Sequence, residues 1–387
     1  MRKIKAIVIG AGIGGLTVGI ALKQAGYEVE IYERVRSLRP AGAGISLWSN
    51  GIKVLNYLGL GDEIARIGGE MNRMAYRSHK DELLSEIDLR SLFKKVKQRP
   101  YPVARTDLQQ MLLAAFGSDS VHMGMCCTAV EQSEKEATAF FEDGTSLSAD
   151  IIVAADGIRS VIREYVLGQA LTPRYAGYVN WNGLVDADSS LCEADNWVLY
   201  VGEGKRASMM PVGCDRFYYF FGVPMPSGSE TAPENRREEL TSHFAQWPLP
   251  VQLLIQRLDP TASNRLEISD IDPPERFVRG RVALLGDAAH ASTPTLGQGG
   301  CQAIEDAFVL ARMLSNSNTS VADTLLQYQQ ARKPRTSDLV LKARKRTDTI
   351  YAKDMQKTQK WYEQLSSEPP ESVVNALEKV IVGGPLG

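Results

Sequence analysis

The chain has 387 residues, of which 44% are hydrophobic and 23% charged, as in a globular protein long enough for two domains. A formal net charge of −2 argues against a surface built to bind nucleic acid or an anionic membrane. Five cysteines without a C-x-x-C spacing and only four histidines argue against a disulfide framework or a metal site, and they favour a reducing, cytoplasmic location.

The first predicted elements are a strand, a glycine turn, a helix and a second strand. Residues 4–9 are apolar, Gly10, Gly12 and Gly15 follow, and the second strand ends at Glu33. In dinucleotide-binding proteins such glycines permit a tight turn, let backbone N–H groups approach a pyrophosphate, and let the helix pack on the strand. The acid then accepts hydroxyls of the adenosine ribose. The opening therefore predicts a dinucleotide site, with a glycine-rich turn that binds nothing as the alternative.

The elements that follow alternate between strand and helix patterns, with no run of about 18 apolar residues that would span a membrane. A glycine-rich loop is expected at 39–51, and Thr106 is a candidate N-cap. A solvated, basic helix face is expected at 332–346. Strand patterns cover 74–79, 127–148, 149–155, 174–225, 265–271 and 280–285, and helical patterns cover 52–68, 105–117, 231–258, 301–314 and most of the chain after 321.

Two further motifs lie where buried strands run into turns. Asp156-Gly157 follows one strand, and Gly286-Asp287 follows another, ahead of the segment 294–301 that opens a helix. In this order and spacing, these motifs and the opening glycine turn resemble the single-component FAD-dependent aromatic-ring monooxygenases. The resemblance covers nearly the whole chain and implies an FAD cofactor.

The resemblance also implies an α/β fold with three parts. A Rossmann-like FAD-binding domain would be discontinuous, with a mostly antiparallel β-sheet substrate domain inserted into it and a helical segment at the C-terminus. The implied boundaries are 1–72, 101–173 and 276–335 for the FAD-binding domain, 73–100 and 174–275 for the substrate domain, and 336–387 for the C-terminal helices.

FAD-binding residues follow from the same resemblance. Asp287 would bind a ribityl or ribose hydroxyl, and small residues at the following helix start would let the backbone approach the flavin ring. Cys127 would contact adenine through its backbone alone. An N-cap role for Asp287 and a packing role for the helix-start loop are the alternatives. The implied cofactor-binding residues are Gly10, Gly12, Gly15, Glu33, Arg34, Ser46, Arg105, Cys127, Asp156, Asp287, Gly297, Gln298, Gly299, Gly300 and Cys301.

Three polar residues of the β-rich region are candidates for binding a substrate. Asn180, Arg206 and Tyr218 lie on strands predicted to be neighbours, and Asn180 and Arg206 can face one cavity if the sheet is antiparallel. An amide and a charged fork suit a planar, anionic ligand rich in heteroatoms. The alternative is a sheet with one polar face in solvent.

Several strings, among them YAGYVNWNGLV, VGEGKR and GQGGC, resemble the bacterial FAD-dependent urate hydroxylases within this group. That family converts urate to 5-hydroxyisourate in purine catabolism, with NADH and O2, through a flavin C4a-hydroperoxide. The resemblance implies catalytic roles for Arg206 and Tyr218 and substrate binding by Asn180. Thr295 departs from the family pattern, because the family carries an aspartate directly after the proline that corresponds to Pro294. We assign Thr295 to the substrate site as well.

Other functions stay open at this point. One is an FAD-dependent hydroxylase of a salicylate-like or other phenolic or heteroaromatic acid, and another is a non-catalytic dinucleotide-binding protein.

His290 is predicted to be structural rather than catalytic. No second glycine fingerprint is visible for NADH, which is expected to bind transiently at a surface groove. A monomer or homodimer is expected, with neither nucleic acid nor membrane as a partner.

Overall fold

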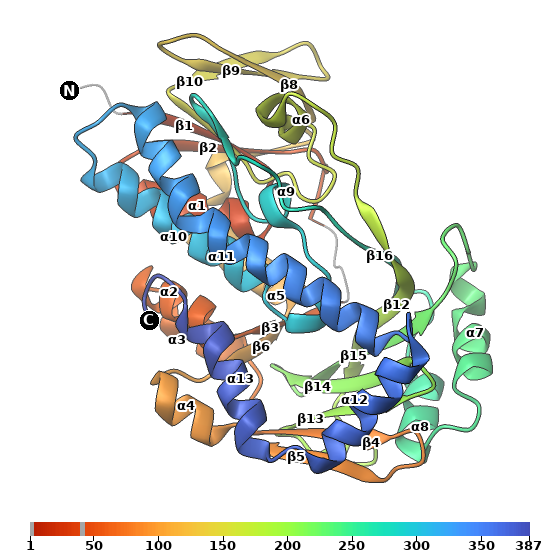
Figure 1. The fold of residues 1–387 in the computed structure, drawn as a ribbon. Coiled ribbons are helices and arrows are strands. Elements are labelled where there is room, and N and C mark those ends of the chain that lie inside the picture. The colour runs from red at the N-terminus through yellow and green to blue at the C-terminus, as the bar shows by residue number, and fades with distance from the viewer. Residues whose placement is uncertain (1–3, 39–42) are drawn as a thin grey trace.

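The computed structural model describes residues 4–38 and 43–387, so part of the predicted loop at 39–51 lies outside the described residues (Figure 1). Its upper layer in Figure 1 is a sheet with the strand order β17-β18-β11-β1-β2-β7, parallel except for the β17–β18 edge pair. This parallel sheet is hydrophobic on both sides because helices or further strands cover it. Its strands are β1 (Lys5–Ile9), β2 (Glu28–Glu33), β7 (Val121–Met123), β11 (Ile151–Ala154), β17 (Val278–Arg279) and β18 (Val282–Leu284).

The lower layer is a second, larger sheet with the order β16-β12-β15-β14-β13-β4-β5, antiparallel except for the β13–β4 pair. Its strands come from segments 73–88 and 174–270, which lie within the predicted substrate domain, although the domain boundaries themselves stay a prediction. The strands of this antiparallel sheet are β4 (Arg73–Ser78), β5 (Leu83–Asp88), β12 (Arg174–Asp186), β13 (Asn196–Gly202), β14 (Lys205–Val212), β15 (Arg216–Pro224) and β16 (Asn264–Asp270).

Smaller sheets and the helices complete the described structure. The predicted meander at 127–148 is β8 (Cys127–Gln132), β9 (Ala137–Phe141) and β10 (Ser146–Ala149), and β3 (Gly44–Leu47) pairs with β6 (Tyr101–Ala104). The α-helices are α1 (Ile13–Gln24), α2 (Ser49–Tyr57), α3 (Gly61–Ile67), α4 (Arg90–Val96), α5 (Arg105–Phe116), α6 (Ile162–Leu167), α7 (Arg236–His243), α8 (Leu249–Arg257), α9 (Asp287–His290), α10 (Gly299–Asn316), α11 (Val321–Ile350), α12 (Met355–Ser367) and α13 (Pro370–Val382). Single 3₁₀ turns are η1 (Ser118–Ser120), η2 (Pro233–Asn235) and η3 (Pro294–Leu296).

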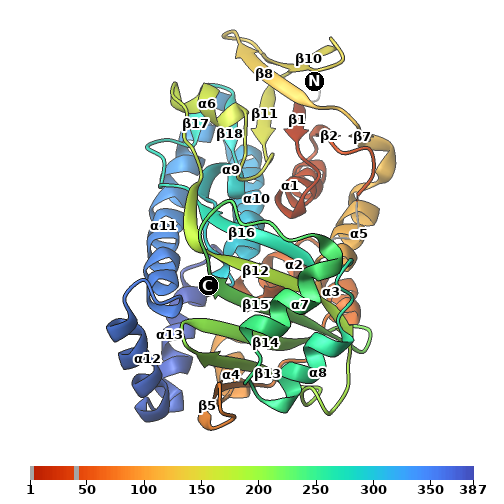
Figure 2. The same cartoon turned by 90° about the vertical axis from the view of Figure 1, so that its right-hand side faces the viewer.

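The antiparallel sheet has two different faces because side chains alternate along each strand. One face, which carries Trp181, Tyr219 and Phe221, packs against α7 and α8 in a buried cluster (Figure 2). The opposite face carries Asn180 and Arg206 and turns toward the parallel sheet. The strand pattern of the sequence therefore decides which polar side chains point inward.

The predicted α/β architecture, with an inserted and mostly antiparallel sheet followed by C-terminal helices, is confirmed. The predicted N-cap at Thr106 is wrong, because α5 already begins at Arg105 and Ala104 occupies the cap position in an extended conformation. Within residues 4–38 and 43–387, no helix combines the length and the apolar character needed to cross a bilayer.

Candidate active site

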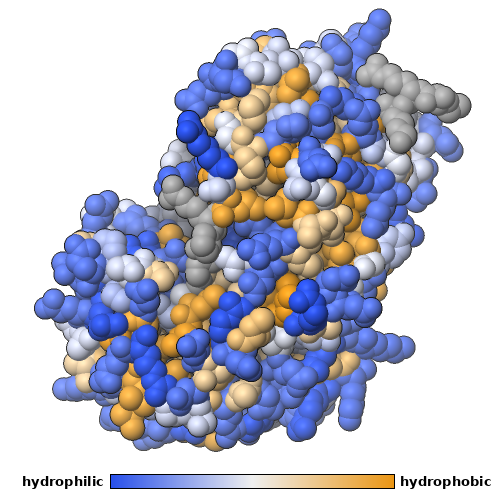
Figure 3. Space-filling model, turned by 180° about the vertical axis from the view of Figure 1, so that it is seen from behind, coloured by the Kyte–Doolittle hydropathy of each residue, from blue (hydrophilic) through white to orange (hydrophobic). Residues whose placement is uncertain are grey.

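A cavity of about 980 Å³ lies between the parallel sheet and the inward face of the antiparallel sheet. Seen from behind, hydrophobic residues gather across the hollow between the two parts of the molecule (Figure 3). The predicted site residues that line the cavity are Gly10, Gly12, Glu33, Arg34, Ser46, Arg105, Cys127, Asp156, Asn180, Arg206, Tyr218, Asp287, Thr295, Gly297, Gln298, Gly299 and Gly300. Residues that lie 290 positions apart in the sequence thus meet in one space.

The opening glycines occupy three different environments at one end of this cavity. A Cβ at Gly10, whose φ is +106°, would lie 2.4 Å from the carbonyl oxygen of Ala155, and a Cβ at Gly15 would lie 1.9 Å from the oxygen of Gly10. Both glycines are therefore required for close packing of backbone on backbone. A Cβ at Gly12 would meet nothing within 4 Å. Gly12 thus borders open space at the N-terminus of α1, where an anionic group is favoured.

Glu33 is held in place by the glycine turn that it faces. One carboxylate oxygen accepts the N–H of Ala11 at 2.8 Å, and the other accepts the N–H of Val35 at 3.1 Å. Each oxygen keeps a lone pair for a further donor. The carboxylate is thus oriented to accept hydroxyl groups of a ligand that lies along the turn.

Asp156 presents an acceptor that no described residue satisfies. Its Oδ2 accepts the N–H of Val161 at 3.0 Å, whereas its Oδ1 is buried without a hydrogen-bond partner in the described structure. Burial raises the pKa of the Asp156 carboxyl, although hydrogen bonds from Ser160 and nearby backbone oppose the rise. A buried polar atom without a partner on a cavity wall indicates a site for a donor from a ligand.

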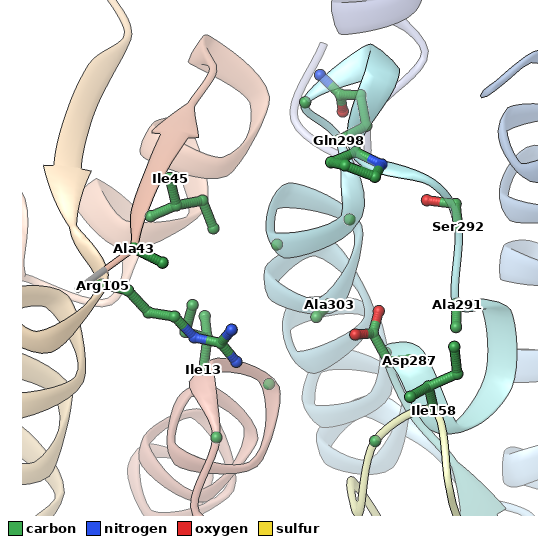
Figure 4. Close-up of a pocket in the computed structure, with 18 of the residues that line it drawn as sticks. Ile13, Ala43, Ile45, Arg105, Ile158, Asp287, Ala291, Ser292, Gln298 and Ala303 are labelled. Atoms are coloured by element: carbon green, nitrogen blue, oxygen red, sulfur yellow. The ribbon is translucent and has the colours of Figure 1, made fainter. Parts of the chain in front are cut away.

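Charged groups face each other across the middle of the cavity. Figure 4 shows Arg105 reaching in from one wall, beside Ile13 and Ile45, and Asp287 reaching in from the opposite wall, beside Ala303. Both side chains are exposed to the cavity, and neither is in an ion pair among the described residues. The N-cap alternative for Asp287 is wrong, since Gly286 holds the cap position of α9.

The start of α10 provides a surface on which backbone is accessible. A Cβ at Gly300 would lie 2.4 Å from Cδ1 of Ile45, and a Cβ at Gly297, where φ is +62°, would lie 2.7 Å from Oγ of Ser46. Gln298 is fixed by Asn50, whose Nδ2 donates to its Oε1 at 3.0 Å. The long α10 therefore directs the positive end of its dipole at the cavity through a loop with little side-chain bulk.

Two predicted cofactor residues lie behind the wall rather than on it. Gly15 packs on Gly10, as described above. The Cys301 thiol faces α2, where it accepts the N–H of Trp48 at 3.3 Å, and burial raises its pKa to about 12. The Cys301 side chain therefore points away from the cavity, and the assignment of Cys301 as a cofactor-binding residue stays a prediction. Cys127 does border the cavity, and burial raises the pKa of its thiol to about 12 as well, so neither thiol is reactive near neutral pH.

Asn180 and Arg206 lie in one row of the antiparallel sheet. Asn180, Tyr218 and Arg206 lie on three neighbouring strands, as predicted, because β15, which carries Tyr218, runs between β12 and β14 and places Gly222 opposite both Asn180 and Arg206. At the usual strand spacing this separates their Cα atoms by about 10 Å. Asn182 donates from Nδ2 to Oδ1 of Asn180 at 2.7 Å, which leaves the Asn180 amide group as a donor toward the cavity.

Arg206 is a buried cation that lacks an acidic partner. Its side chain is only 6% exposed, its Nε finds no hydrogen-bond partner, and no carboxylate of the described residues forms an ion pair with it. The guanidinium carbon lies 5.2 Å from the ring centre of Phe220. A buried charge without a counter-charge is costly, so this arrangement indicates a place for an anionic ligand.

Tyr218 and Thr295 border the same end of the cavity. The Tyr218 ring packs on Gly44, where a Cβ would lie 2.3 Å from its Cγ, and burial raises the pKa of its hydroxyl well above the usual range. The Thr295 hydroxyl donates to the carbonyl oxygen of Ala343 on α11 at 2.9 Å. Thr295 therefore uses its polar group to hold η3 against α11, and it supplies no charge to the site.

Sequence reasoning missed several residues that complete the cavity. Tyr178 follows the same alternation as Asn180 on β12, so the strand pattern contained a signal for it. Tyr351 and Arg346 come from the end of α11, and residues of α13 also contribute, which no local pattern indicates. The helix α11 thus belongs to the site as well as to the scaffold.

The basic segment 332–346 is not a solvated face throughout, so that prediction is wrong in part. Arg332 is buried and donates to the carboxylates of Glu305 at 2.7 Å and Asp306 at 2.6 Å. Arg346 lines the cavity. No local pattern indicates this pairing, because the acidic partners lie on α10, about 26 positions earlier.

His290 has a structural role, as predicted from its motif. Its Nε2 lies 2.6 Å from Oδ2 of Asp306, and the same carboxylate oxygen accepts the N–H of Gly286. Burial alone would raise the pKa of Asp306, but the charges of His290 and Arg332 lower it to about 2. This buried network fixes the loop that carries Asp287, and it leaves the imidazole without access to the cavity.

Comparison with known proteins adds to this geometry. The family model described as FAD binding domain matches residues 3–343. A FAD-dependent urate hydroxylase of Klebsiella pneumoniae is 48% identical over 99% of this chain and 100% of its own length, and one of Mycolicibacterium vanbaalenii is 49% identical over 99% and 98%. The crystal structure of Klebsiella pneumoniae HpxO with FAD and uric acid has a TM-score of 0.97 at 48% identity, covering 99% of this chain and 98% of that one.

The matches extend over the glycine turn, both aspartate loops, the antiparallel sheet and most of α11. The urate hydroxylase sequence and the HpxO structure each match 99% of this chain, so their matches span the elements that form the cavity. This chain belongs to the FAD-dependent monooxygenase family that includes the FAD-dependent urate hydroxylases.

Proposed function

We propose that this protein hydroxylates urate to 5-hydroxyisourate with FAD as its bound cofactor and NADH and O2 as co-substrates. The observation that carries the proposal is the buried Arg206 guanidinium, which lacks an acidic partner and shares a sheet row with Asn180 in the cavity that Gly12, Asp156 and Asp287 also border. Relatives of 48–49% identity that span the whole chain carry the same activity in their names.

The residues present fit an FAD molecule. Open space at Gly12 and the dipole of α1 suit a pyrophosphate, Glu33 suits ribose hydroxyls, and the unsatisfied Oδ1 of Asp156 suits a hydroxyl or amide donor. The accessible backbone at Gly297 and Gly300 suits a flat ring. When bound, FAD would supply the redox chemistry that accepts hydride from the nicotinamide and activates O2.

Arg206 and Asn180 would bind the substrate. Urate is planar, rich in carbonyl and N–H groups, and readily becomes an anion, so it offers Arg206 the missing counter-charge and offers the Asn180 amide an acceptor. The guanidinium would also stabilise negative charge that develops as the ring loses a proton. Arg206 thus acts as the electrostatic centre of the reaction.

Tyr218 would serve as a hydrogen-bond donor. Because burial raises the pKa of its hydroxyl, the phenol keeps its proton at neutral pH. It can then donate from Oη to an oxygen of the substrate and hold the ring in place. Apolar side chains beside it, among them Phe220 and Met210, exclude water from the same end of the cavity.

Thr295 cannot act as a negatively charged partner for Arg206. Its hydroxyl donates to α11 and carries no charge, so in this proposal the substrate anion supplies the negative charge that pairs with Arg206. We further propose that the protein is a monomer or homodimer. We also propose a reducing, cytoplasmic setting, which the five free cysteines support.

The test uses the purified protein. A yellow holoprotein should oxidise NADH with formation of 5-hydroxyisourate when urate is added, measured by absorbance and by chromatography of the product. Salicylate and other phenolic acids, added under the same conditions, examine the second substrate class. A colourless protein that takes up no flavin would refute the cofactor, and turnover of a phenolic acid with none of urate would refute the substrate.

A further inference from the structure

Tyr351 occupies the gap in the sheet row between Asn180 and Arg206. It follows the last residue of α11, and its side chain lies over Gly222, the residue opposite both of them. A Cβ at Gly222 would lie 2.3 Å from the Tyr351 hydroxyl oxygen and 2.6 Å from Cε1. The phenol therefore fits at this point only because position 222 has no side chain.

The Tyr351 ring is fixed by its neighbours. It stacks on the ring of Tyr178 with centroids 3.7 Å apart and an angle of 14° between the planes. Both side chains are buried, at 6% and 0% exposure, and both border the cavity. The helix end that carries Tyr351 is itself docked, because Gly204 in the β13–β14 turn packs against Ala352. A buried, stacked ring on a docked helix end presents its hydroxyl at a defined position.

The hydroxyl groups of Tyr178 and Tyr351 lie near the positive charge of Arg206. Burial raises the pKa of Tyr351, and the nearby Arg206 charge and hydrogen bonds with Arg206 and Tyr178 oppose part of that rise, so the phenol stays protonated near neutral pH. The Nε of Arg206 is buried without a hydrogen-bond partner in the described structure. This unsatisfied donor belongs to a guanidinium beside the Tyr351 hydroxyl on the cavity wall. It indicates that a polar ligand completes the cluster.

We propose that Tyr351 is a substrate-binding and specificity-determining residue, whose hydroxyl bonds the heteroatom edge of the planar anion held by Arg206 and Asn180. This inference rests on the proposed function for the identity of the anion. A purine-like ring presents polar atoms along that edge, whereas a phenolic acid presents C–H groups to part of it. A phenolic ligand would therefore leave the buried polar atoms unsatisfied, which is how such sites reject analogues.

The variant Tyr351→Phe tests the hydroxyl alone, because phenylalanine keeps the ring that stacks on Tyr178. Tyr57→Phe on α2 is the matched control, since Tyr57 is 65% exposed and does not border the cavity. The oxidised holoproteins are titrated with urate and with salicylate, and binding is measured by perturbation of the visible flavin spectrum. KM and kcat for urate are measured in parallel.

Loss of the hydroxyl should weaken urate binding and raise KM about tenfold, the effect of one lost hydrogen bond to a charged ligand. The preference for urate over salicylate should fall by a similar factor, with flavin content unchanged. Gly222→Ala, which displaces the same phenol, should weaken urate binding as well. Tyr57→Phe should match the wild type in every measurement.

Urate binding and selectivity that are the same in Tyr351→Phe and wild type would overturn this inference and leave the proposed function in place. A wild type that binds urate without hydroxylating it would refute the proposed function only, because the binding comparison still decides the role of Tyr351. A wild type that does not bind urate would refute both.

Discussion

Replacing Arg206 with methionine should separate binding from folding. Methionine has a similar length and can pack on Phe220, but it removes the buried guanidinium. Losing one partner of a buried, hydrogen-bonded charge pair costs about 2–5 kcal/mol of binding free energy. The affinity for urate should therefore decrease by a factor between about 30 and several thousand. Flavin content should not change, because the glycine turn and the two aspartate loops are untouched.

The same substitution should leave the free energy of unfolding equal or higher. In the free protein, Arg206 is 6% exposed without an acidic partner, so its charge is desolvated with only partial compensation from the Phe220 ring and the Tyr351 hydroxyl. Replacing such ions with apolar side chains is neutral or stabilising by about 1–4 kcal/mol, and at this chain length each kcal/mol corresponds to a rise in Tm of about 1–2 °C. Thermal unfolding followed by circular dichroism measures the shift.

Arg312→Met on α10 is the control. Arg312 lies over Phe308 in a similar cation–π contact, but it is exposed and outside the cavity. It should bind urate as the wild type does. A clear loss of stability in Arg206→Met together with unchanged urate affinity would refute the reasoning, since Arg206 would then be a structural residue.

Further predictions concern the cofactor, pH and the thiols. Asp287→Ala should lower the affinity for FAD about tenfold, which the flavin absorbance retained after gel filtration measures, whereas full retention would remove Asp287 from the site. The pKa of Asp306 is lowered to about 2, so its carboxylate contributes about 2 kcal/mol of stability above pH 4 that is lost as pH falls toward 2. Urea unfolding across this range should show the loss, and Asp306→Asn should abolish that part of the slope. A thiol reagent at pH 8 should modify the exposed Cys214 quickly and Cys301 only after unfolding, which mass spectrometry of the labelled peptides detects; rapid labelling of Cys301 in the native protein would contradict its position.

The parts of the site that the sequence predicted are those encoded by local geometry. Gly10 and Gly15 are required by backbone contacts within one strand–turn–helix unit, so their spacing is visible in the chain. The prediction that Asn180 and Arg206 can face one cavity depended on an antiparallel sheet, which the structure has. The glycine spacing alone needed no knowledge of how distant segments pack.

The parts that the sequence missed depend on long-range packing. Tyr351 enters the site because β15 lies between β12 and β14 and because α11 ends over Gly222, and neither the strand order nor the helix end is encoded nearby. Arg332 reads as a surface cation by composition, since Glu305 and Asp306 become its partners only when α10 and α11 pack together. The thiol of Cys301 faces α2 for the same reason.

The helix α11 links the loop that carries Asp287 to the part of the cavity wall that carries Tyr351. Its 30 residues extend about 45 Å, with Arg332 anchored beneath the loop that carries Asp287 and Tyr351 placed just beyond its far end. If FAD binds at the Asp287 loop and the substrate binds at Tyr351, as proposed, the length of α11 would set the separation between the two ligands. Changes that adapt the pocket to guests of another size should therefore accumulate on the strands, where they leave that separation intact.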